Sequence, residues 1–157
     1  MKPIAYLLFL AALAGAACAS PILTLTLSQS TLTANAGDTV TFMATALNTA
    51  AVTENLNGDS FSITAPPTLD DSDYFNEWPF ALSAGQSFGP TDLFAVTVPL
   101  GTGAGSYAGT FNITGGPSVS DQNVLGSTAF TVVVTPEPGT VALVSIGFAL
   151  AVLRRRV

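Results

Sequence analysis

Apolar residues alternate with threonine and serine along much of the chain between residues 23 and 134. A period of two places the apolar side chains on one face of an extended strand and the hydroxyl side chains on the other. The alternation is strict at residues 23–28 (LTLTLS), and no stretch of comparable quality has a helical period. It returns at residues 39–46, 60–64, 94–98, 107–113 and 130–134, with Gly, Pro, Asn and Ser between the segments.

Strands with a single apolar face need a second layer to bury that face. A region of about 115 residues is long enough to bury roughly two-thirds of its unfolded surface without disulfides. We therefore predict an all-β fold, a two-sheet sandwich of about six or seven short strands, formed by residues 20–134 as one domain.

Charge is scarce and of one sign in the middle of the chain. The 157 residues include 4 basic ones, Lys2 and Arg154–Arg156, whereas the 10 acidic residues lie between Asp38 and Glu137 and histidine is absent. The predicted domain thus lacks the usual general bases, Schiff-base lysines, phosphate clamps and imidazole ligands. We predict a protein that is not an enzyme and does not bind nucleic acid.

The N-terminal segment, residues 1–19, has the composition of an export signal. Lys2 supplies a positive charge, and an apolar run (IAYLLFLAALA) follows at residues 4–14. As a helix this run spans about 16 Å, roughly half of a bilayer core, which favours a cleaved signal helix over a permanent span.

Small residues mark the expected cleavage site of this signal. Ala17 and Ala19 fit the A-x-A pattern, so signal peptidase is expected to cut before Ser20. Lipidation of Cys18 is the alternative, but Gly15 stands where such signals usually have a leucine.

The C-terminal segment, residues 135–157, begins with a break in regular structure at Pro136, Glu137 and Pro138. Proline removes a backbone donor and forces the preceding residue to be extended, so neither a sheet nor a helix continues through this motif. The motif therefore predicts an exposed hinge that a protease can reach.

An apolar run and a basic tail complete this segment. Residues 139–153 form a short predicted transmembrane helix of about 24 Å, which can cross a membrane if the arginines snorkel and the bilayer thins slightly. By the positive-inside rule, Arg154, Arg155 and Arg156 stay on the cytoplasmic side as a stop-transfer signal. The sandwich domain is then exported, in agreement with the N-terminal signal.

The order of Pro-Glu-Pro motif, short helix and arginine tail resembles the PEP-CTERM sorting signal of exported bacterial proteins. The resemblance implies that an exosortase, an integral-membrane cysteine peptidase, recognises Pro136, Glu137 and Pro138 and removes the anchor. It also implies a route from the inner membrane to the cell envelope or to an exopolysaccharide biofilm matrix. An ordinary tail anchor is the alternative.

Residues 82–87, 94–99 and 105–107 resemble the late strands of bacterial immunoglobulin-like domains. The resemblance implies an immunoglobulin-like sandwich and a tyrosine-corner-like contact at Tyr107. The chain has no Cys-Trp-Cys core, so it differs from antibody domains.

Four carboxylates gather in a predicted loop at Asp70, Asp71, Asp73 and Glu77. Closely spaced oxygen ligands of this kind can bind Ca²⁺, and the ion could bridge the anionic domain to a polyanionic polysaccharide. The spacing is not that of an EF-hand, because Leu82 stands where the loop's last glutamate belongs. A solvated acidic loop is the alternative.

Aromatic residues accompany these acids at Tyr74, Phe75, Trp78 and Phe80. Flat rings beside carboxylates are typical of sugar-binding surfaces, although Trp78 can equally cover the end of the core. The leading hypothesis is a non-enzymatic exported protein with a structural or adhesive role. The alternative is a carbohydrate-binding module, Ca²⁺-assisted, that uses residues 70–80. An uncovered edge at residues 130–134 would favour self-association.

Overall fold

The computed structural model describes residues 22–136 and Gly139. The predicted signal segment, residues 1–19 with its cleavage site at Ala17, Ala19 and Ser20, lies outside the described residues. So do Glu137, Pro138, nearly all of the predicted transmembrane helix and the arginine tail. Within the described ranges no helix is long and apolar enough to cross a membrane.

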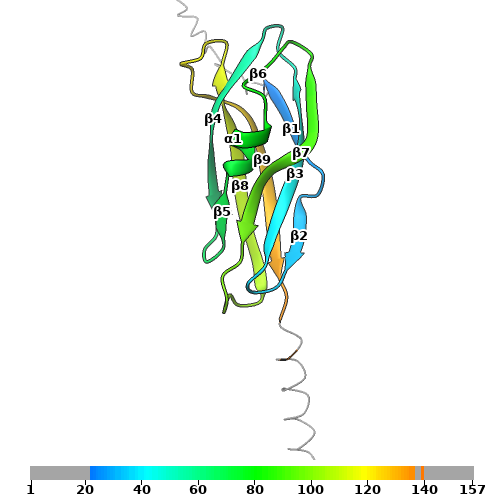
Figure 1. Ribbon diagram of the computed structural model, residues 1–157, viewed down its shortest axis with the longest axis vertical. Helices are drawn as coiled ribbons and strands as arrows, with labels where there is room; N and C mark the ends of the chain where they lie inside the picture. The colour runs from blue at the N-terminus through cyan, green and yellow to red at the C-terminus, as the bar shows by residue number, and fades with distance from the viewer. Residues whose placement is uncertain (1–21, 137–138, 140–157) are drawn as a thin grey trace, which may run out of the picture.

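The described residues form nine β-strands and one short α-helix (Figure 1). The strands are β1 (Leu23–Leu27), β2 (Thr31–Ala34), β3 (Thr39–Asn48), β4 (Glu54–Ile63), β5 (Thr68–Asp70), β6 (Ala81–Leu82), β7 (Ser87–Thr97), β8 (Gly105–Gly116) and β9 (Asn123–Val134), and the helix is α1 (Ser72–Glu77).

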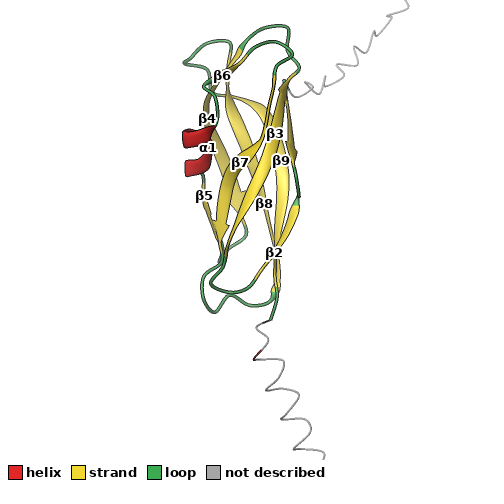
Figure 2. Cartoon of the chain, turned by 45° about the vertical axis from the view of Figure 1, so that its right-hand side comes forward, coloured by secondary structure: helices red, strands yellow, loops and turns green. Residues whose placement is uncertain are grey.

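Two sheets pack face to face, as Figure 2 shows. One has the order β1-β3-β7-β5 and the other has the order β2-β9-β8-β4-β6. Neighbouring strands are antiparallel, except that β2 runs parallel to β9. The predicted all-β fold of two packed sheets is confirmed.

Phenylalanines from both sheets form the centre of the core. Phe42 and Phe94 come from one sheet, Phe111 and Phe130 from the other, and all four are buried. The ring centroids of Phe94 and Phe111 lie 4.9 Å apart and those of Phe42 and Phe130 lie 5.1 Å apart. These contacts join the two sheets, because offset or tilted aromatic pairs add attraction to the burial of their area.

The predicted edge at residues 130–134 is not an edge. Thr31–Ala34 of β2 pairs with Thr131–Val134, and β8 pairs with the other side of β9. β2 was not predicted from the sequence, because its four residues follow a polar turn and carry too few apolar positions to show a period. The correction removes this segment as a cause of self-association.

The described domain begins and ends at opposite ends of the sandwich. Figure 1 shows β1 starting near the end that carries β6, and β9 leaving at the other end, beside β2. The last contact is made by Thr135, whose backbone N–H donates to the Ala34 carbonyl at 3.0 Å.

Candidate functional site

The acidic–aromatic segment, residues 70–80, contains a helix where a loop was predicted. α1 covers Ser72–Glu77 and packs beside β7. The Asp70 carboxylate accepts a hydrogen bond from the Ser72 backbone N–H at 3.0 Å, and the Tyr74 N–H donates to the Asp71 carbonyl at 3.1 Å. The helix ends at Glu77, and the next residue, Trp78, is extended because Pro79 follows it.

Tyr74 of α1 and Trp78, the residue that follows α1, are both buried, at 3% and 6% exposed. The Tyr74 hydroxyl donates to the Gly58 carbonyl on β4 at 3.2 Å, and Trp78 Nε1 donates to the Asp92 carbonyl on β7 at 2.7 Å. The helix is thus tied to both sheets. Trp78 belongs to the core, and its ring is not available for stacking on a sugar.

Phe75 and Phe80 are the exposed aromatic residues of this segment, at 55% and 86%. Beside them lies a hollow of only about 20 Å³, lined by Leu56, Tyr74, Phe75, Trp78, Pro79 and Phe80. That volume admits about one water molecule. Any sugar contact therefore depends on the outer faces of Phe75 and Phe80.

The four carboxylates proposed as calcium ligands have different surroundings. The hydrogen bonds from Ser72 lower the pKa of Asp70, whereas desolvation, followed by the charges of Asp92, Glu77 and Asp70, raises the pKa of Asp73. Glu77 Oε2 accepts a hydrogen bond from the Thr91 hydroxyl at 2.9 Å. The part of the chain that the structure describes holds no group of three or more potential metal ligands. The calcium site stays a prediction.

The remaining carboxylate of the four, Asp71, lies beside Asp59. Asp59 was not among the residues predicted from the sequence. Burial, and then the charge of Asp71, raises the pKa of Asp59 to about 6. The Asp59 Oδ2 atom is buried and has no hydrogen-bond donor among the described residues. Two ionised carboxylates only accept hydrogen bonds, so a bond between them requires one shared proton. In the sequence, Asn57-Gly58-Asp59 resembles a turn, and nothing local indicates this pairing.

Glu54 is a second acidic residue whose burial no local sequence pattern indicates. It is 2% exposed, and its Oε2 atom has no hydrogen-bond donor within the described ranges. The neighbouring buried polar residue, Asn48, is satisfied, because its Nδ2 atom donates to the carbonyls of Val52 and Leu82 at 2.9 and 2.8 Å.

The contact predicted at Tyr107 is confirmed. The Tyr107 hydroxyl donates to the Gly103 carbonyl at 2.8 Å, four residues upstream and just before β8. A tyrosine bound to the backbone just upstream at the start of a strand fixes the corner between two sheets.

The folded domain ends directly before the predicted sorting motif. The Thr135 hydroxyl donates to Asn35 Oδ1 at 2.9 Å, and the next residue, Pro136, is exposed and lies beyond the last strand. Glu137 and Pro138 lie outside the described residues.

No protein-family model matches the chain, and no curated protein is significantly similar to it.

Proposed function

We propose that this chain is a non-enzymatic exported protein whose domain has a structural or adhesive role in the cell envelope or exopolysaccharide matrix. The chain is anchored in the inner membrane at first, with the domain outside the cytoplasm. An exosortase then processes it at Pro136, Glu137 and Pro138, and the domain is released to its destination.

The junction at Thr135 is the observation that carries this proposal. The hydrogen bonds of Thr135 to Ala34 and Asn35 close the sandwich, and exposed Pro136 follows at once. At the other end, β1 begins at Leu23, three residues after the expected cleavage before Ser20. Both expected processing events therefore leave every strand of the domain intact.

The strand order supports an immunoglobulin-like version of the sandwich. The order β1-β3-β7-β5 corresponds to strands A, B, E and D, and β9-β8-β4 corresponds to G, F and C. The Tyr107 contact also fits, since the tyrosine corner lies at the start of strand F. The middle of the chain differs, because β5 precedes β6, whereas an added C′ strand would precede strand D. Such a fold presents surfaces and needs no catalytic cleft.

Fractionation of the native host tests the sorting step. We expect a form shortened near Pro136 outside the inner membrane, by intact-mass analysis, and retention of the full-length chain in the membrane when Pro136, Glu137 and Pro138 are all changed to Ala. Pro117→Ala, in an exposed loop, is the matched control and should be processed normally. Full-length protein in the membrane for every variant would mean an ordinary tail anchor.

Carbohydrate binding is a second candidate, favoured by the exposure of Phe75 and Phe80. Its test is titration of the full chain with the host exopolysaccharide, with and without EDTA, while the fluorescence of Trp78 is followed. Binding at this site predicts a saturable change that Phe80→Ala removes. A flat titration in which the chain also fails to co-sediment with the polysaccharide would exclude the module, and insensitivity to EDTA would exclude the role of Ca²⁺.

A further inference from the structure

Part of the edge of β3 has no described strand paired with it, although β2 of the other sheet passes close by. β1 pairs with β3 only from Ala44 to Asn48, and the Ser28 N–H then donates to the Met43 carbonyl at 2.8 Å. From there the chain crosses to β2 in the other sheet. Among the described strands, none pairs with Thr39–Phe42 on this side of β3.

Backbone groups of Thr39 and Thr41 point to this vacant edge. The N–H and C=O of one residue in an antiparallel strand lie on the same side, and the side alternates along the strand. The Asp38 carbonyl accepts from Val98 on the β7 side, whereas the Met43 carbonyl accepts from Ser28 on the β1 side. The even-numbered residues of this stretch therefore face β7, and Thr39 and Thr41 face away from it.

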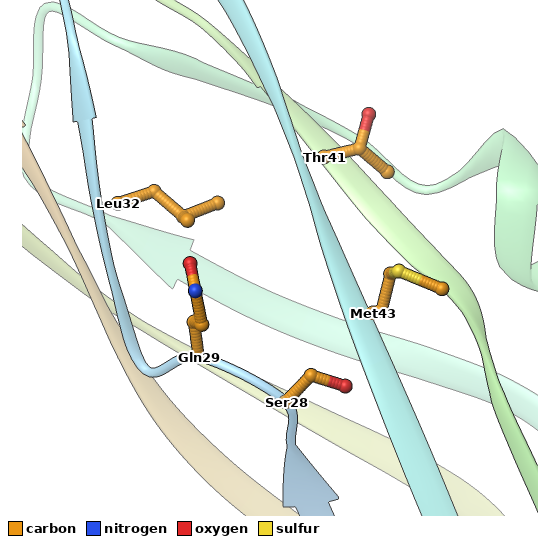
Figure 3. A pocket seen from close by; sticks show the side chains of 5 residues that line it. All are labelled: Ser28, Gln29, Leu32, Thr41 and Met43. Atoms are coloured by element: carbon orange, nitrogen blue, oxygen red, sulfur yellow. The ribbon is translucent and has the colours of Figure 1, made fainter.

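A hollow of about 320 Å³ lies beside this edge and is lined by Ser28, Gln29, Leu32, Thr41 and Met43. Figure 3 shows Leu32 extending from β2 toward β3, with Gln29 and Ser28 on the crossover below it. A strand that entered here would find backbone partners on β3 and apolar contact with Leu32 and Met43.

The usual protection of strand edges is missing at this place. Natural sheets guard their edges with charge, proline or very short strands. β5 has three residues, ends at Asp70 and follows two prolines, and β6 has two residues after Pro79 and Phe80. Residues 28–32 and 39–43 include neither a charged residue nor a proline.

The negative charge of the domain determines which kind of strand can bind in the hollow. Every charged side chain between residues 22 and 136 is acidic, and Asp92 lies opposite Met43 on the neighbouring strand. A second copy of this domain or an acidic segment is repelled, and a basic segment is attracted. We propose that the hollow is a strand-addition site for a partner protein, which inserts an extended segment of alternating β-branched residues flanked by basic side chains.

The test uses the full chain in detergent micelles and a fluorescent peptide of alternating threonine and valine flanked by lysines. Anisotropy should show binding on the order of tenfold tighter than for the same peptide with glutamate flanks, and high salt should reduce the difference. In a bound strand, only every second backbone N–H of the peptide faces β3. N-methylation of the nitrogens that face β3 should therefore abolish binding, whereas N-methylation of the other nitrogens should leave binding intact.

Two variants locate the site. Met43→Arg places a charge in the hollow and should weaken binding of the lysine peptide at least tenfold. Leu47→Arg is the matched control, because Leu47 is equally exposed (39% against 41%) on the same strand but lies where β1 covers the edge. Thr41→Pro removes one N–H at the vacant edge and should weaken binding about three- to tenfold, since one net hydrogen bond has that value.

Three results would overturn the proposal. The first is equal binding of both methylated peptides, and the second is equal loss in Met43→Arg and Leu47→Arg. The third is a concentration-dependent dimer that Met43→Arg abolishes without any peptide binding, which would assign the edge to a second copy. None of these bears on C-terminal processing, so this inference and the proposed function can fail separately.

Discussion

The burial of Asp59, and then the neighbouring charge of Asp71, make the stability of this domain depend on pH. The pKa of Asp59 rises from 3.8 to about 6 on folding, so the folded state holds the proton more tightly than the unfolded chain. The stabilising contribution is fully present below pH 3.8 and is lost as the pH rises through about 6. We therefore expect Asp59→Asn to raise the thermal midpoint more at pH 7 than at pH 4.

Asp70→Asn is the control, because the pKa of Asp70 is shifted in the opposite direction from that of Asp59. The pKa of Asp70 is lowered by its hydrogen bonds, so its contribution is present above its ordinary pKa and is lost as the pH falls. Asp70→Asn should lower the midpoint at pH 7, and this loss should shrink as the pH falls below the ordinary pKa of 3.8. Equal pH profiles for both variants and the parent would contradict the assignment of the Asp59 pair.

Glu54 offers a second prediction for a single residue. Its buried Oε2 atom lacks a donor among residues 22–136, so an apolar side chain of similar shape should remove a desolvation cost. We expect Glu54→Met to raise the free energy of unfolding by about 1–3 kcal/mol in urea titrations followed by Trp78 fluorescence. Exposed Glu77→Met should change it by less than about 0.5 kcal/mol. A loss of stability in Glu54→Met would show that the carboxylate is needed.

These residues also show where sequence reasoning ends. The alternation at residues 23–28 is sufficient to place Leu23 and Leu25 in the core, because period two is a local property. The pairing of Asp59 with Asp71 depends on how β4 lies beside α1, and no local pattern encodes it. Tyr107 was predictable because its partner is four residues away.

At the scale of elements, β1 packs closely against β9, although the two strands belong to different sheets. A Cβ atom on Gly126 would lie 2.6 Å from the Leu23 carbonyl oxygen, which is shorter than real contacts. We expect Gly126→Ala to lower the free energy of unfolding by about 1–3 kcal/mol, because the two strands must separate. Gly105→Ala, on β8 with open space around it, is the matched control and should be neutral or slightly stabilising.

Short elements escaped prediction for a related reason. β5 and β6 have three and two residues, too few for a period to show, and they are strands only because longer neighbours pair with them. α1 has six residues and owes its place to Tyr74 and Trp78, which bind opposite sheets. Both aromatic residues were noticed in the sequence, but their burial follows from the tertiary fold.

The whole domain carries charge of a single sign, and this predicts a response to salt. The acidic side chains between residues 22 and 136 repel one another with no cation to balance them. Raising the ionic strength from low to physiological values should therefore raise the thermal midpoint, because screening weakens the repulsion. Asp121→Asn should reduce the size of this rise. A midpoint that falls with salt would mean that specific polar contacts dominate.

The position of β9 determines how the domain carries mechanical load. β9 is held on one side by β8 along nearly its whole length and on the other side by β2 near its C-terminal end. A pull on Thr135 along the strand therefore loads all of these hydrogen bonds in shear at once, and they cannot open one after another as in a zipper. If the C-terminal end is the point of attachment, as proposed above, tension from the far end of the sandwich is carried by β9 and its two neighbours.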